Sequence, residues 1–151
     1  MAVIRGGEII AGKLQEMTKG FRQKELLRVG FLSGAKYPDG TSVALVAAFN
    51  EYGSPSRGQP PRPFFRNAIA RHESEWPELI TGLLKKNHYN GELALAEAGA
   101  VIAGQIRQSI IDLISPPLAE STVRAKGGVD KPLIDTGTML GSVDFEVKVG
   151  D

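Results

Sequence analysis

The chain contains no cysteine, which excludes disulfide bonds, thiol nucleophiles and thiolate metal sites. This absence agrees with synthesis and function in a reducing compartment. Membrane signals are missing as well, because no apolar stretch approaches the ~18 residues that a spanning helix needs. Residues 1–8 also lack the basic-then-apolar order of a signal peptide. We therefore expect a soluble protein with no membrane partner.

Charge of one sign is scarce too. The 151 residues include 18 basic and 17 acidic side chains, a net charge of +1, far from the concentrated positive charge of a dedicated nucleic-acid binder. Hydrophobic residues make up 42%, which is enough for a folded core. At ~100–200 residues per domain, the length predicts a single domain over residues 1–151.

The residues that usually carry catalysis form no recognisable motif. The only histidines are His72 and His88, and neither has the partner that a zinc-protease helix requires. The Gly-x-Ser-x-Gly elbow of hydrolases and the glycine patterns of phosphate-binding loops are also absent from the sequence. The sequence thus predicts no metal site, no cofactor and no enzyme. A small hydrolase using His72, His88 and Ser121 is the third-ranked hypothesis.

Periodicity predicts helices at two places above all. Residues 8–24 place Ile10, Leu14, Met17 and Phe21 on one face among charged residues, as in an amphipathic helix. Residues 92–114 form the longest periodic segment and predict the helix at the centre of the core. Its apolar stripe is Leu95, Ile102, Ile106, Ile110 and Leu113, and small residues near Gly99 and Gly104 flatten part of its surface for a close helix or subunit contact.

Alternating apolar residues predict two strands, at residues 26–33 and 142–149. The sequence Pro38-Asp39-Gly40 is a turn signal after the first, so this strand is expected to turn back. Residues 42–52 fit either a strand or a short helix ended by Gly53, and the helix is favoured. The predicted class is α+β, a small antiparallel or mixed sheet packed against the long helix, with shorter helices and long loops.

Prolines and glycines divide the rest of the chain into loops and short helices. Residues 53–63 are expected to form an exposed loop, with Pro63 as the first residue of a helix and Pro77 opening another. A short helix is predicted over residues 119–125. Asp135 or Thr136 is expected to cap a helical turn containing Met139 and Leu140.

One stretch of the sequence has a strong local charge. Residues 53–71 contain four arginines and no acid, namely Arg57, Arg62, Arg66 and Arg71. We expect an anionic partner at this cluster, and the acidic rim of another protein is favoured over nucleic-acid phosphate. Phe64 and Phe65 stand within the cluster, and core packing is favoured over partner contact for this pair.

Two blocks of sequence carry a resemblance to a known family. Residues 49–53 (Phe-Asn-Glu-Tyr-Gly) and 61–66 (Pro-Arg-Pro-Phe-Phe-Arg) resemble the N-E-[FY]-G and P-x-R-P-F pattern of small phage tail-completion and tail-component proteins. Residues 118–127 and 131–143 resemble the L-x-x-x-T-x-x-x-K-G and K-P-L-x-D-T-G-x-[LM]-x-x-S-[IV] ending of phage virion-morphogenesis proteins. The order of the blocks in a cysteine-free chain of this length is more specific than either block alone.

The resemblance implies a structural virion protein of a tailed bacteriophage or prophage. Such a protein is made in the host cytoplasm and belongs to the tail or neck, at the head-proximal end of the tail, where it assembles as a ring. The implied partners are a tail terminator, the tail tube, the head connector and further copies of itself, with six copies by family analogy. A neck protein that contacts DNA through Arg57–Arg71 is the alternative.

The resemblance also implies roles for individual residues. Loops 34–42, with Tyr37 and Asp39, and 53–63 are expected to reach toward neighbouring subunits. Gly53 would end its helix in a left-handed conformation. The longer loop Ser54–Gln59 departs from the family pattern, so its contacts are expected to be peculiar to this chain. The positions expected to define the fold are Glu51, Gly53, Pro63, Phe64, Asp135, Thr136, Gly137 and Leu140.

Overall fold

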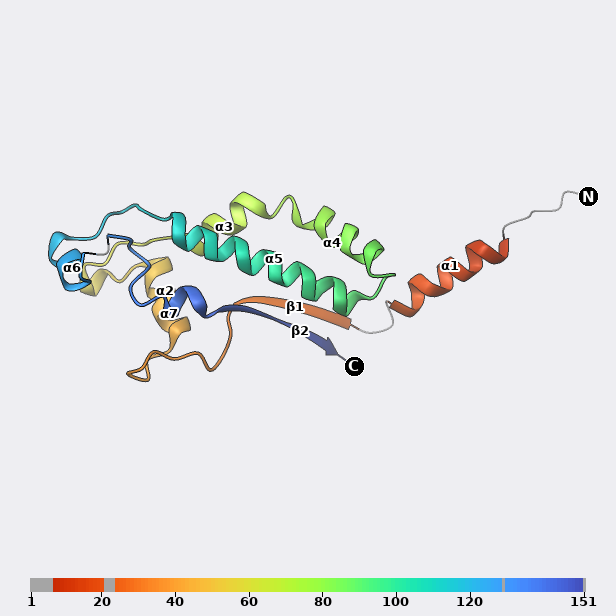
Figure 1. Cartoon of the computed structure of the whole chain (residues 1–151), viewed down its shortest axis with the longest axis horizontal. Helices are drawn as coiled ribbons and strands as arrows, with labels where there is room; N and C mark the ends of the chain where they lie inside the picture. Colours follow the sequence, from red (N-terminus) through yellow and green to blue (C-terminus); the bar gives the residue numbers. More distant parts are fainter. Residues whose placement is uncertain (1–6, 21–23, 129, 151) are drawn as a thin grey trace, which may run out of the picture.

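The computed structural model describes residues 7–20, 24–128 and 130–150. Its centre is helix α5 (Gly91–Asp112), which at ~1.5 Å per residue is about 33 Å long. A two-stranded sheet covers one face of α5, and helices α3 (Phe64–His72) and α4 (Trp76–Lys86) cover another (Figure 1). The other helical elements are α1 (Gly7–Gly20), α2 (Val43–Tyr52), the 3-10 turn η1 (Pro55–Arg57), α6 (Glu120–Ala125) and α7 (Thr138–Gly141).

The sheet confirms the predicted α+β class. Strands β1 (Lys24–Phe31) and β2 (Val143–Gly150) pair antiparallel, with Phe31 opposite Val143. The alternation predicted from the sequence is correct, because Leu27 and Val29 pack against the core. The β1–β2 ribbon thus presents one apolar face to α5.

The path that follows β1 differs from the prediction. The Pro-Asp-Gly turn does form, since the Gly40 N–H donates to the Tyr37 carbonyl at 2.9 Å. It closes only an isolated bridge between Lys36 and Ser42, so the expectation that the strand turns back on itself is wrong. Helix α2 begins directly after Ser42 and leaves no residues for a second strand, and β1 pairs with β2 instead.

Helix α5 begins one residue before the predicted start at residue 92 and ends earlier than predicted. The Asn90 side chain caps it by accepting a hydrogen bond from the Leu93 N–H at 3.0 Å. The predicted end at residue 114 is wrong, because Leu113 already has extended backbone angles before the Pro116–Pro117 break. The predicted core role of α5 is correct, since Ile106 and Ile110 are fully buried.

The small residues of α5 serve the sheet. A Cβ added at Gly99 would lie 2.6 Å from the Phe145 ring and 2.8 Å from Leu27, so only glycine lets the ribbon approach this closely. Gly99 therefore packs inside the fold and is not free for the subunit contact considered from the sequence. Gly104 is exposed, and a Cβ added there would meet no atom of the described chain within 4 Å, apart from its own helix.

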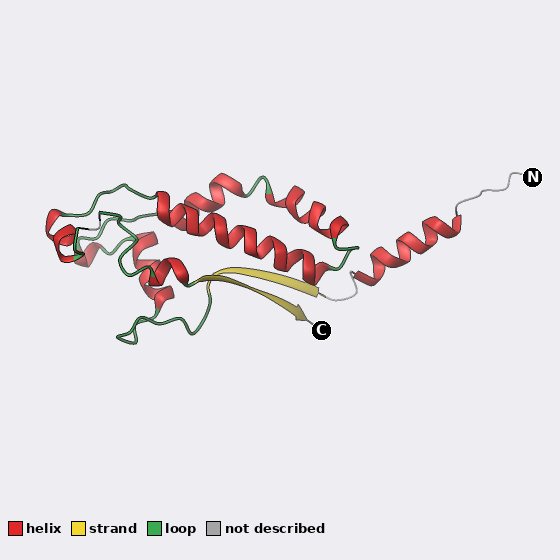
Figure 2. Cartoon of the chain, in the orientation of Figure 1, coloured by secondary structure: helices red, strands yellow, loops and turns green. Residues whose placement is uncertain are grey.

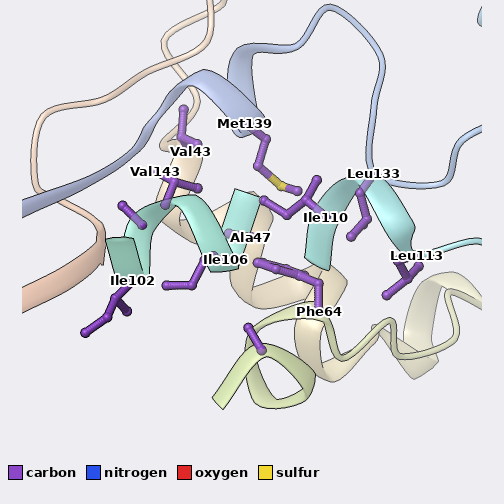
Figure 3. Packing of buried hydrophobic residues seen from close by; sticks show 12 residues of the cluster. Val43, Ala47, Phe64, Ile102, Ile106, Ile110, Leu113, Leu133, Met139 and Val143 are labelled. Atoms are coloured by element: carbon purple, nitrogen blue, oxygen red, sulfur yellow. The ribbon is translucent and has the colours of Figure 1, made fainter. Parts of the chain in front are cut away.

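The main core lies where α2, α3, α7 and the start of β2 meet one end of α5 (Figure 3). Phe64 is buried there and makes an edge-to-face contact with the Phe31 ring, with the ring centroids 6.0 Å apart, which confirms the core packing predicted for it. Figure 3 shows side chains from all these elements converging: Val43, Ala47, Phe64, Ile102, Ile106, Ile110, Leu113, Leu133, Met139 and Val143. Most of the irregular backbone lies at this end too (Figure 2).

Helix α1 extends away from the opposite end of the molecule (Figure 1). It is shorter than the predicted 8–24, because Lys24 already belongs to β1. Phe21, which was expected on its apolar face, lies outside the described residues. The last turn of α1 meets the loop before α5, where Glu16 lies 3.8 Å from His88 and Gly20 packs on the Tyr89 carbonyl.

Candidate functional site

Glu51, in the first block of the resemblance, holds two helices together. Its carboxylate is buried, with 5% of the residue exposed, and it lies in the last turn of α2. It accepts hydrogen bonds from the backbone N–H groups of Phe65 (2.9 Å) and Arg66 (3.2 Å) in the first turn of α3. These donors have no partner within their own helix, so Glu51 acts as a capping residue supplied by another helix.

Arg66 completes this arrangement. Its Nε donates to the Glu51 carboxylate at 2.7 Å, and its guanidinium lies over the Tyr52 ring at 5.3 Å. The side chain is half exposed, so it contributes little net charge to a partner while it neutralises Glu51. The sequence predicts Pro63 as the first residue of this helix, but Pro63 is the N-cap of α3, and the helix begins at Phe64.

Arg62 is buried, so the prediction of a partner-binding arginine at this position is wrong, although most of the 53–63 loop is exposed as predicted. Only 6% of the residue is exposed. Its guanidinium donates to the carbonyls of Pro116 (3.3 Å) and Pro117 (3.5 Å), and its N–H donates to the Asn50 carbonyl at 2.7 Å. Burial lowers the pKa of Arg62. The residue therefore fastens the 53–63 loop to the segment after α5.

Arg57 and Arg71 are both exposed but lie in different surroundings. Arg57 stacks over the Phe49 ring at 5.4 Å, and Arg71 lies 3.7 Å from Asp112. The four arginines predicted as one cluster therefore do not present four free charges. Within the 53–63 loop Arg57 is exposed and Arg62 is buried, while Arg66 lies in α3 and pairs with Glu51.

Gly53 is the C-cap of α2 and has a backbone conformation that favours glycine. Its φ of 76° and ψ of 176° have the predicted positive φ, but they lie outside the left-handed helical region. A Cβ at this position would lie 2.8 Å from the Gln59 carbonyl oxygen and from the Pro61 nitrogen. The returning loop therefore passes too close for any other residue.

The turn at residues 37–40 leaves Asp39 exposed and Tyr37 partly buried. Asp39 accepts a hydrogen bond from the Thr41 N–H at 2.9 Å, and this bond lowers the pKa of Asp39. Partial burial, followed by the nearby Asp135 and Asp39 carboxylates, raises the pKa of Tyr37. Asp39 stabilises its own exposed turn, whereas Tyr37 faces the interior of a cavity.

The second block of the resemblance is built around Gly137. Gly137 is the N-cap of α7 in the left-handed conformation (φ 79°, ψ 0°), so the prediction that Asp135 or Thr136 is the cap is wrong. The Thr136 hydroxyl accepts a weak hydrogen bond from the Thr138 N–H at 3.4 Å. Leu140 packs against the core, and Asp135 is exposed at the cavity edge.

The two blocks enclose an open cavity of about 740 Å³. Lys126 spans its wall by donating from Nζ to the carbonyls of Lys131 (2.9 Å) and Ile134. Lys126 belongs to the second block of the resemblance, and the sequence did not indicate this role, because the carbonyls that it binds follow it in irregular backbone. The lining side chains that concern the predicted site are Tyr37, Arg57, Arg62, Asp135 and Met139.

A second hollow, which we call the apolar groove, was not predicted. It has a volume of about 460 Å³ and lies between the end of β1, α2 and α3. Ala44 and Ala48, one turn apart on α2, leave space for it, and Tyr52 stands at its side with 70% of the residue exposed. The spacing Ala44–Ala48–Tyr52 is the sequence signal for this surface. The groove residues are Val29, Gly30, Phe31, Ala44, Ala47, Ala48, Tyr52, Phe64, Phe65 and Ile69, with Glu51 and Arg66.

The histidines of the hydrolase hypothesis lie apart from this region. His72 faces Glu75 at 3.2 Å near the end of α3, and His88 faces Glu16 at 3.8 Å. In residues 7–20, 24–128 and 130–150, no three His, Asp or Glu side chains gather as metal ligands. Across the same part of the chain, no helix combines the length and apolar composition needed to cross a bilayer.

Comparison with known proteins adds no further constraint. Neither a family model nor a curated protein nor a solved structure matches the chain. The motif blocks and their geometry therefore carry the functional proposal.

Proposed function

We propose that the chain is a structural virion protein of a tailed bacteriophage or prophage, a tail-completion or head–tail joining subunit at the head-proximal end of the tail. One observation carries the proposal. The two blocks of the resemblance, far apart in sequence, fold against each other at one end of α5. Arg62 of the first block binds the carbonyls that lead into the second, and Asn50 lies 3.9 Å from Met139.

The hydrogen bonds of three polar side chains in these blocks support a structural role. Glu51, Arg62 and Lys126 each bind two or more backbone groups of another segment. Such bonds fix loops in place and leave these side chains engaged. These motif residues thus stabilise a rigid surface, which suits a protein that functions by binding other subunits.

The subunits are proposed to form a ring, six by family analogy, between the tail tube or tail terminator and the head connector. Head-to-tail contacts close into rings when their rotation permits. The net charge of +1 favours this arrangement, because a strongly charged subunit would repel its own copies.

The test uses the phage or prophage that encodes the chain. Deleting the coding sequence should give separate heads and tails by electron microscopy, and purified protein added to the lysate should restore joined particles. Properly joined particles without the protein would refute the proposal.

A pair of charge reversals sharpens this test. Arg57→Glu changes an exposed residue of the 53–63 loop and should reduce joining at an unchanged unfolding temperature. Lys85→Glu, on the exposed side of α4, is the matched control and should restore joining fully. Equal joining by both variants would show that the loop does not meet a partner.

The alternative to a protein partner at Arg57 is contact with DNA. Binding of the purified protein to duplex DNA across a salt series distinguishes the two, because each phosphate neutralised steepens the salt dependence. We expect no salt-dependent affinity. A steep slope that Arg57→Glu reduces would replace the protein partner with DNA.

A further inference from the structure

Helix α1 carries an apolar face that the described chain leaves uncovered. Ile9, Ile10 and Leu14 are 77%, 62% and 56% exposed, although they stand at helical spacing on or beside one face. Near its end α1 contacts the loop before α5, where Glu16 lies 3.8 Å from His88 and Gly20 packs on the Tyr89 carbonyl, and the rest extends away from the fold (Figure 1). Contiguous apolar surface of this kind marks a protein-binding face.

The apolar groove is a second uncovered surface, and its chemistry matches that face. Its floor is formed by small and aromatic side chains, among them Ala44, Ala48 and Phe65. The charged groups at the groove, Glu51 and Arg66, already bind each other at 2.7 Å. An apolar helix bound in the groove would therefore exclude water from these two side chains without leaving either charge unpaired.

The geometry does not bring the two surfaces of one chain together. The groove lies at the Phe31 end of β1, whereas α1 precedes the Lys24 end, about 25 Å away at the rise of a strand. The contacts of Glu16 and Gly20 with the 88–91 loop direct α1 outward from that end. An outward helix and a distant groove on the same chain fit a contact between copies.

We propose that α1 of one subunit lies in the apolar groove of the next subunit, with Ile10 and Leu14 against Ala44 and Ala48. This contact joins unlike surfaces, so it repeats head to tail and closes into a ring when the rotation allows. The described charges of α1 are Glu8, Lys13, Glu16 and Lys19, which balance and do not oppose the approach. The inference deepens the proposed function by naming the contact between ring subunits, and it rests on that function only for the ring's place in the virion.

The size of the contact sets how it behaves in solution. A helix of 14 residues that uses one face buries less than the ~800 Å² per partner of a standard stable interface. A single contact is therefore weak, and a closed ring gains from having two contacts per subunit. Assembly is expected to depend steeply on protein concentration.

The absence of cysteine makes a direct test possible. Leu14→Cys and Ala48→Cys are purified separately, mixed at high protein concentration, and oxidised with copper phenanthroline. Mixing should give a disulfide-linked dimer containing one chain of each variant. Gln15→Cys, on the polar side of α1, is the matched control and should give at least tenfold less of the mixed dimer with Ala48→Cys.

Two results would overturn the inference. One is a mixed dimer that is absent or no more abundant than with Gln15→Cys. The other comes from the double variant with cysteine at positions 14 and 48: a disulfide within one chain, undiminished on dilution, would mean that α1 occupies its own groove.

Sedimentation gives an independent measurement. Wild-type protein should pass from monomer to a larger species as concentration rises, and Leu14→Glu and Ala48→Glu should remain monomeric with unchanged unfolding temperatures. Gln15→Glu should behave as wild type, and a wild-type protein that stays monomeric up to millimolar concentration would contradict the proposal. Joined particles in the gene deletion would refute the virion role and leave the cross-link unaffected, so the two failures are distinguishable.

Discussion

The Glu51 carboxylate offers the sharpest test of how this fold is held. Replacing Glu51 by alanine removes the acceptor of two backbone N–H groups at the start of α3 and of the Arg66 Nε. Loss of a helix cap costs about 0.5–2 kcal/mol, and hydrogen bonds to a charged group contribute about 1.5–3 kcal/mol. Because Arg66 is half exposed and can be hydrated, we expect a total loss of about 2–4 kcal/mol in the free energy of unfolding.

Thermal and urea denaturation measure this loss. For a chain of this length, the expected loss lowers the unfolding temperature by roughly 5–15 °C. Glu51→Gln keeps one acceptor oxygen without the charge and should lie between wild type and alanine. The control is Glu73→Ala, an exposed carboxylate after α3 with no side-chain hydrogen bond in the described chain, which should stay within ~0.5 kcal/mol of wild type.

Two results would refute this account of Glu51. If Glu51→Ala unfolds within ~1 kcal/mol of wild type, the interhelical cap does not contribute as the burial and distances imply. If Glu51→Gln is as damaging as alanine, the charge on the carboxylate matters and its accepting geometry does not.

Three further predictions concern single residues of the same region. Arg62→Met should lower the free energy of unfolding by about 2–4 kcal/mol, because the carbonyls of Pro116 and Pro117 lose their charged donor; urea denaturation checks this, and a neutral effect would contradict the burial of Arg62. Gly53→Ala should cost about 1–3 kcal/mol through its positive φ and its contact with the returning loop, and an unchanged unfolding temperature would argue against that conformation. Tyr37 should ionise above its ordinary pKa of about 10, since its pKa is raised; stability from this group is complete below that pH and falls as pH rises through the folded-state pKa. The pKa of Tyr37 is measured by ultraviolet titration of the wild type and of Tyr37→Phe. If Tyr37→Phe lacks the phenol that ionises at the lowest pH, the pKa of Tyr37 is lowered and the prediction is wrong.

Local signals in the sequence predicted most of the helices. Gly53 and Pro77 mark helix ends because glycine and proline act on the backbone within a residue or two of their own position. The alternation of β1 likewise follows from its own residues. Its partner does not, because the choice of β2 over a nearby strand depends on α2 occupying residues 43–52.

The candidate site was predicted less well than the fold, because its contacts join distant residues. The burial of Arg62 depends on carbonyls 54 positions away, and the capping role of Glu51 on N–H groups 14 and 15 positions away. A cluster of arginines in sequence therefore suggested a basic patch, whereas the fold turns two of its members to structural use. The apolar groove needed three elements to come together before it existed.

The pairing of β1 with β2 orders events during synthesis. The partner of Phe31 is Val143, so translation must proceed through most of the chain before the ribbon can close. Val29 and Phe31, which line the apolar groove, stay in an unpaired strand until then. A nascent polypeptide from which β2 has not yet emerged therefore lacks the paired strand that forms one side of the apolar groove.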